Sequence, residues 1–127
     1  MQRLCWIVLL LIACGSAHAN EAMRDCYESG TVLAQCAAAW ERVFQAGNKA
    51  TDATTAYQLG SYEGYVSGVA DQGLGTSWCQ ATRNIADTQI WALVAKYLRE
   101  HPESWNQHTL MMVNAALQQF APCPAHK

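Results

Sequence analysis

The stretch TVLAQCAAAWERVFQA, residues 31–46, sets the fold class of this chain. Its apolar residues recur every three or four positions, which is the period of one face of an α-helix. Gly47 follows at a position where a left-handed residue commonly ends a helix, and Thr51 or Asp52 is placed to cap the next helix. The stretch therefore predicts an amphipathic helix with an apolar stripe made of Val32, Leu33, Cys36, Ala39, Trp40, Val43 and Phe44.

Three further segments carry helical periodicity. The second helix is expected over about residues 54–72, and the third is expected to start at a cap formed by Asp87 or Thr88. Pro102 fits the first turn of a final helix that ends before residues 121–124. No segment alternates as a strand would, so the sequence predicts an all-α fold, a compact bundle of about four main helices stapled by disulfides. The inner face of the final helix should contain Trp105, Thr109, Met112, Val113, Ala116, Leu117 and Phe120.

Glycines recur every four residues in the second helix, at Gly60, Gly64 and Gly68. Each glycine costs about 1 kcal/mol relative to alanine inside a helix, so close packing on this face would have to offset the loss. Two interpretations follow. Either a neighbouring helix of the same chain packs closely on the glycines, or a second subunit or partner backbone docks there.

Residues 72–87 show no sustained period and are expected to form a long loop held at Cys79. Loops of this length are uncommon in compact domains unless they serve a function. Trp78 either anchors this loop to the core, which we favour, or forms an exposed contact.

The first nineteen residues have the features of an export signal. Arg3 supplies a positive charge, residues 6–13 form a short apolar run, and Ala17-His18-Ala19 is a typical cleavage site. Cleavage would leave residues 20–127 as a single domain in the periplasm, with no later stretch long enough to span a membrane. In the alternative interpretation, cleavage before Cys14 would leave that cysteine as a lipid-bearing N-terminus.

Four cysteines follow the expected cleavage site, and an even number in an oxidising compartment favours two disulfides. Three pairings are possible. A continuous helix would hold Cys26 and Cys36 about 15 Å apart, so their pairing requires a chain break, which Ser29-Gly30-Thr31 offers. The preferred pairing joins Cys26 with Cys36 and Cys79 with Cys123.

The charged and polar residues give little support to several functional classes. Seven basic and ten acidic residues follow residue 19, without a basic cluster, which makes nucleic acid a poor partner. His101, His108 and His126 lack the spacing of a metal or haem site, and Glu100 and Glu103 flank a helix break. We therefore expect no catalytic residues, no metal and no cofactor.

Short motifs in the second half of the chain, within residues 57–123, occur in a recognisable order. This order resembles the Rap/Tai family of secreted immunity proteins, which protect bacteria from peptidoglycan amidase toxins delivered by type VI secretion. The matching residues are Gly64-Tyr65, Gly68, Trp78-Cys79, Gln89, Lys96-Tyr97-Leu98, His101-Pro102-Glu103, Ala116-Leu117, Phe120 and Pro122-Cys123.

The resemblance implies a periplasmic homodimer that binds a secreted peptidoglycan amidase effector and blocks its active-site cleft with an exposed loop. The glycine face could serve the dimer contact. The expected partner-binding tip of the loop consists of Gly73, Leu74, Gly75, Thr76 and Ser77. The plainer interpretation is that this loop only connects two helices.

Two other functions remain open at this point. The chain could be a non-catalytic adaptor, periplasmic or lipid-anchored, that binds an envelope protein. A small hydrolase is disfavoured, because the motifs assemble no nucleophile with a neighbouring base.

Overall fold

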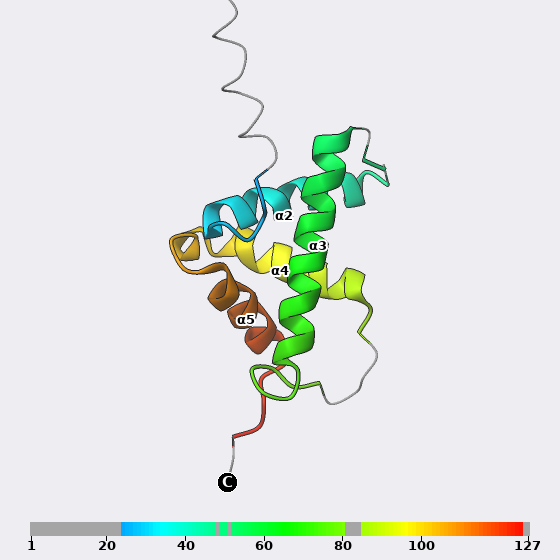
Figure 1. The fold of residues 1–127 in the computed structure, drawn as a ribbon. Coiled ribbons are helices and arrows are strands. Elements are labelled where there is room, and N and C mark those ends of the chain that lie inside the picture. The colour runs from blue at the N-terminus through cyan, green and yellow to red at the C-terminus, as the bar shows by residue number, and fades with distance from the viewer. Residues whose placement is uncertain (1–23, 48, 51, 81–84, 126–127) are drawn as a thin grey trace, which may run out of the picture.

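The computed structural model describes residues 24–47, 49–50, 52–80 and 85–125. Within these residues the chain forms helices and no strand, which confirms the predicted all-α bundle. Figure 1 shows α3 lying across the front of the other helices. The elements are α2 (Gly30–Gln45), α3 (Ala53–Gly73), α4 (Asp87–Glu100), the short 3₁₀ helix η1 (Pro102–Ser104) and α5 (Thr109–Phe120).

Polar side chains and one glycine fix the ends of the first two helices. Ser29 caps α2, because its side chain accepts a hydrogen bond from the backbone N–H of Val32 at 3.3 Å. Gly47, with φ of +62°, follows the helix in the left-handed conformation that the sequence predicted. Asp52 rather than Thr51 caps α3, and its carboxylate accepts from the N–H of Thr55 at 2.8 Å.

The start of α4 differs from the prediction. Ala86 occupies the cap position, and Asp87, one of the two expected caps, is the first helical residue. The side chain of Gln89 accepts a hydrogen bond from the N–H of Ala86 at 3.2 Å. Gln89 therefore satisfies the N–H of the cap residue, whereas Ala86 has no side-chain oxygen to accept from the first N–H groups of the helix.

The predicted final helix is divided into two elements. Pro102 begins η1, and α5 begins only at Thr109, where the His108 side chain accepts from the N–H of Leu110 at 3.3 Å. Trp105 therefore lies between the two helices rather than on α5. Its indole N–H donates to the carbonyl of Leu98 at 2.8 Å, which ties this connection to α4.

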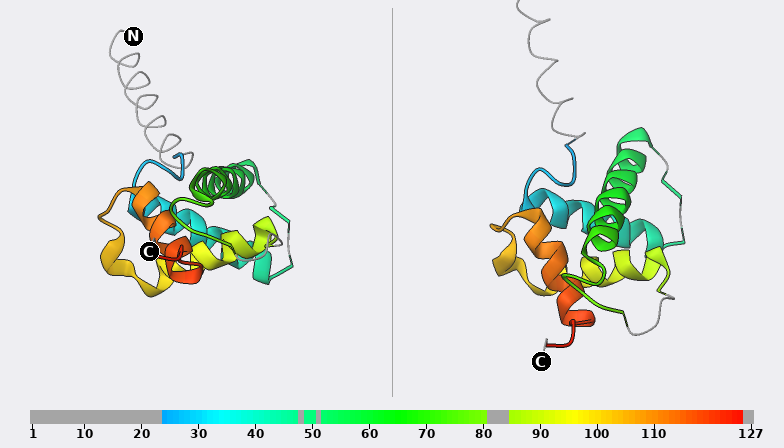
Figure 2. Two further views of the ribbon diagram at one scale, coloured as in Figure 1. Left: turned by 90° about the horizontal axis from the view of Figure 1, so that it is seen from below. Right: turned by 60° about the horizontal axis from the view of Figure 1, so that its bottom comes forward.

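The core lies where α3 crosses α2, α4 and α5 (Figures 1 and 2). Its largest fully buried aromatic residue is Tyr62, whose hydroxyl donates to the carbonyl of Trp91 at 2.7 Å, and burial raises the pKa of this hydroxyl. The other fully buried large side chains are Leu33, Val66, Val94, Leu98, Met112, Val113 and Leu117.

Two aromatic residues that the periodicity placed on inner faces are exposed instead. Phe44 is 55% exposed and stacks on Trp40 with ring centroids 4.8 Å apart, and Phe120 is 48% exposed. Each lies in the last turn of its helix. Periodicity defines a face of a helix, but it does not show how far along that face a neighbouring element extends.

Both predicted disulfides are present. Cys26 and Cys36 are joined with Cα atoms 6.0 Å apart, and Cys79 and Cys123 with Cα atoms 4.6 Å apart. Cys26 also donates its N–H to the hydroxyl of Ser61 at 3.0 Å, so the segment before α2 is fixed to both α2 and α3.

In the described part of the chain, no helix has the length and apolar content that crossing a membrane requires. The predicted signal peptide, residues 1–19, and Cys14 lie outside the described residues. Export and the alternative of lipid attachment therefore stay predictions.

Candidate functional site

A compact turn follows α3 and forms the beginning of the predicted loop. The Gly73 carbonyl accepts hydrogen bonds from the N–H groups of Thr76, Ser77 and Trp78 at 3.1, 2.8 and 3.2 Å. Gly75 donates its N–H to the Trp78 carbonyl at 2.8 Å and has a φ of +82°, a conformation that favours glycine. The backbone of this turn is therefore held by its own hydrogen bonds.

Two contacts anchor the turn to the rest of the molecule. Trp78 is 2% exposed, and its indole N–H donates to the Ala70 carbonyl of α3 at 2.8 Å. Cys79 donates its N–H to the Ala121 carbonyl at 2.9 Å and is joined to Cys123. The preferred interpretation of Trp78 as the residue that anchors the loop is confirmed.

The exposed part of the loop is shorter than the predicted tip. Leu74, Gly75 and Thr76 are exposed and Ser77 is half-buried, whereas Gly73 is the buried last residue of α3. A methyl group at Gly73 would approach Trp78 at 3.2 Å, so this residue belongs to the packed base of the turn. The exposed turn lies at the end of α3, beside the C-terminal segment (Figure 2).

Replacing Trp78 by phenylalanine should lower the free energy of unfolding by about 1–2 kcal/mol, because the buried Ala70 carbonyl would lose its hydrogen bond. Urea denaturation measures this loss. Trp105→Phe is a matched control, because Trp105 also donates to a backbone carbonyl but lies far along the chain from the loop. If Trp78→Phe left stability unchanged, the proposed anchor would be wrong.

The glycine face of α3 is open. No atom of the described residues lies within 4 Å of a methyl group built at Gly60, Gly64 or Gly68, and all three glycines are exposed. The interpretation that a helix of the same chain packs on them is therefore wrong. Helix α3 instead packs through its opposite face, with Tyr62, Val66, Val69 and Ala70, and lies on the outside of the bundle (Figure 1). The homodimer stays a prediction.

A groove of about 490 Å³ lies over the N-terminal half of this glycine face. We call it the Asp25 groove, after the carboxylate at its edge. That carboxylate accepts hydrogen bonds from the hydroxyls of Tyr27, at 2.7 Å, and of Tyr57. The groove is lined by Asp25, Tyr27, Ala56, Tyr57, Gly60, Ser61, Gly64 and Tyr65.

The hydrogen bonds at this carboxylate affect both partners. The Tyr57 hydroxyl, followed by the Tyr27 hydroxyl, lowers the pKa of Asp25, so the carboxylate stays charged over a wider range of pH. The same hydrogen bonds raise the pKa of each tyrosine, which keeps both hydroxyls protonated as donors. No local pattern in the sequence indicates this cluster, because Asp25 and Tyr57 are 32 residues apart.

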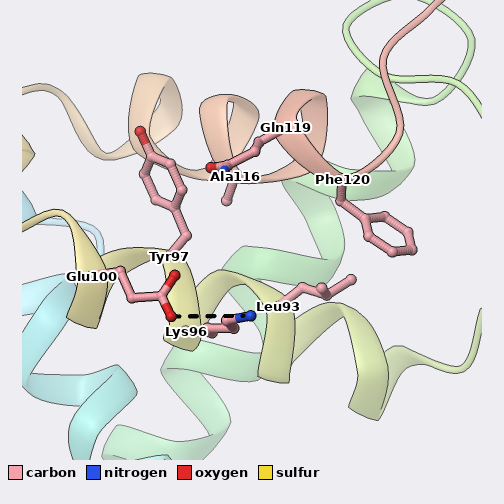
Figure 3. Close-up of a pocket in the computed structure, with 7 residues that line it drawn as sticks. All are labelled: Leu93, Lys96, Tyr97, Glu100, Ala116, Gln119 and Phe120. Atoms are coloured by element: carbon pink, nitrogen blue, oxygen red, sulfur yellow. Dashed lines mark ion pairs between the residues drawn. The ribbon is translucent and has the colours of Figure 1, made fainter.

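A second cleft, of about 200 Å³, lies between α4 and α5 (Figure 3). Tyr97 extends from α4 toward α5, and Lys96 pairs with Glu100 at 4.0 Å on the α4 side. An apolar continuation of the cleft reaches Ile85 and Ala92. Among the described residues that line it, no nucleophile is paired with a base.

The titratable groups singled out in the sequence make ordinary surface contacts. His101 ends α4 and its Nδ1 lies 2.9 Å from the carboxylate of Glu103. Within residues 24–47, 49–50, 52–80 and 85–125, no group of three or more histidine, cysteine, aspartate or glutamate side chains could hold a metal ion. His126 lies outside these residues.

The helices, the two disulfides and the anchored turn define a small disulfide-linked helical protein. Residues 16–123 match the family model of the Rap1a immunity proteins, and the chain belongs to this family. It is therefore an immunity protein, a class that acts on secreted toxins, and the predicted family resemblance is confirmed. No match was found among curated proteins or among solved structures.

Proposed function

We propose that this protein is a periplasmic immunity protein that binds a peptidoglycan amidase delivered by type VI secretion and blocks its active-site cleft. The anchored turn at Leu74, Gly75 and Thr76 carries this proposal, because it is exposed and held in one conformation. It would enter the amidase cleft and exclude the substrate. Inhibition would then be stoichiometric and would need no catalytic group of this chain.

The order of the turn favours tight binding. A loop that is already fixed by hydrogen bonds and a disulfide loses less conformational entropy on binding than a flexible one. Leu74 provides an exposed apolar side chain, 37% accessible, at the start of the turn. Gly75 adds no side chain, so the backbone of the turn could approach the walls of a narrow cleft closely.

The disulfides and the family membership support the proposed location in the periplasm. Two disulfides and membership of an immunity family indicate an extracytoplasmic protein. We propose that residues 1–19 direct export and are removed, which leaves Asn20 as the first residue. The intact mass of the protein recovered from the periplasm would distinguish this product from one cut and lipidated at Cys14.

The direct experiment uses the mature protein as bait against lysates that contain candidate type VI amidases. The proposal expects capture of an amidase whose activity on peptidoglycan reaches zero at a one-to-one ratio of subunits. Light scattering of the same complex reports whether two copies of the immunity protein are present, as the family resemblance predicts. Continued lysis of cells that co-express the toxin and abundant folded protein in the periplasm would contradict the proposal for that toxin.

A further inference from the structure

We propose that the Asp25 groove receives an arginine side chain of the toxin, as a second contact next to the loop. This inference rests on the proposed function, since it adds a binding site for the same partner. The groove lies on the N-terminal half of α3 and the turn follows its C-terminal end, so both surfaces lie along one helix. A partner that follows α3 would reach both.

The groove contains the charged carboxylate of Asp25. Each of its carboxylate oxygens accepts one tyrosine hydroxyl, and a carboxylate has room for about four hydrogen bonds in all. Its neighbour Arg24 pairs with Glu28 at 3.7 Å, and no ion pair to Asp25 occurs within the described part of the chain. The groove therefore holds a charged carboxylate that has acceptor capacity remaining and no ion-pair partner among the described residues.

The walls of the groove are formed by tyrosine side chains and by the open glycine face of α3. Tyr27 and Tyr57 are 52% and 38% exposed as residues, and Tyr65 lies with its ring centroid 5.8 Å from that of Tyr27. Aromatic faces attract cations, and a planar guanidinium stacks on them better than a compact ammonium does. The open space above Gly60 and Gly64 would let this flat group lie against the helix.

The basic side chain would come from a different protein rather than from α3 of a second copy of this chain. The 21 residues of α3 include no lysine or arginine, and they carry the acidic residues Glu63 and Asp71. Two copies packed through this face would offer no base from α3 to enter either groove. A basic residue of a different protein satisfies the charge.

The groove can be tested by itself with a small probe. The blocked peptide acetyl-Gly-Arg-Gly-amide is titrated into the ¹⁵N-labelled protein, and the same peptide with citrulline in place of arginine is titrated separately. We expect saturable shifts of the Gly60 and Gly64 amide signals with arginine only, and at least about a fivefold weaker affinity for Asp25→Asn. Asp71→Asn replaces an exposed carboxylate of α3 that does not line the groove, so this variant should bind the peptide as the original protein does. Equal shifts with citrulline would overturn the proposal.

Binding of the groove variants to the toxin itself distinguishes the groove contact from the proposed function. Asp25→Asn should weaken binding to the amidase about tenfold, whereas Asp87→Asn, which changes an exposed carboxylate in the first turn of α4, should not. Gly60→Leu, which fills open space and should fold normally, is expected to weaken binding similarly. Toxin binding unchanged in both groove variants would overturn the inference but leave the proposed function intact. Groove variants that dissociate a homodimer while keeping toxin affinity would show that the groove joins two copies, and would also overturn it. If the unmodified protein bound no amidase while the peptide result held, the proposed amidase partner would be wrong, although the groove would still bind arginine.

Discussion

Replacing both Leu74 and Thr76 by aspartate is expected to weaken binding to the toxin by at least about 100-fold, without changing helix content. Both side chains lie on the exposed part of the turn. An apolar side chain that becomes buried at the centre of an interface, together with its neighbour, commonly contributes a few kcal/mol of binding free energy. Two carboxylates placed in an amidase cleft would also have to lose their water. Because the backbone hydrogen bonds to the Gly73 carbonyl and the Trp78 anchor remain, the turn itself should persist.

The dissociation constant measured by calorimetry and the circular dichroism spectrum of each variant test this prediction. Leu110→Asp combined with Met111→Asp is a matched control, because both residues are exposed apolar side chains on the first turn of α5. The control should bind the toxin normally. A parallel loss of helix content and affinity in the loop variant would mean that the loop is structural and does not bind the partner.

Replacing Gly30 by alanine should lower the free energy of unfolding by about 3 kcal/mol, although this glycine lies in the first turn of a helix. A methyl group there would lie 2.4 Å from the carbonyl oxygen of Trp105, 2.5 Å from the sulfur of Met112 and 3.0 Å from the carbonyl oxygen of Gln107. Two of these atoms belong to the backbone, so α2 would have to move away from the connection between η1 and α5. The side chain of Met112 is buried and has little room to move.

Gly68→Ala provides the matched comparison. In the part of the chain that the structure describes, nothing lies within 4 Å of a methyl group at Gly68, so this substitution should be neutral or raise stability by up to about 1 kcal/mol through better helix propensity. Urea denaturation of the two variants measures both effects on one scale. Similar free energies of unfolding for the two variants would contradict the close approach at Gly30.

The glycines show where sequence reasoning succeeded and where it failed. The spacing of Gly60, Gly64 and Gly68 identified an unusual helix face but left open whether a helix of the same chain or an external partner packs on it. The structure leaves that face open, and the tight approach occurs at Gly30. In the sequence Gly30 indicated only a chain break. Its neighbours in space, Trp105 and Gln107, are more than 70 residues away, and no local pattern connects them.

The sequence by itself determined the helical class of the fold and the family resemblance of this protein, and it favoured the disulfide pairing and the role of Trp78 that the structure shows. These properties depend on the local period of apolar residues, on the reach of a disulfide, and on short motifs in a fixed order. Tertiary structure alone decided that Gly73 is buried, that Phe44 and Phe120 are exposed, and that Asp25 meets Tyr57. Each of these depends on where one helix ends against another. That position is set by packing between distant segments, because a helical period defines a direction around the axis but not the neighbour that it meets.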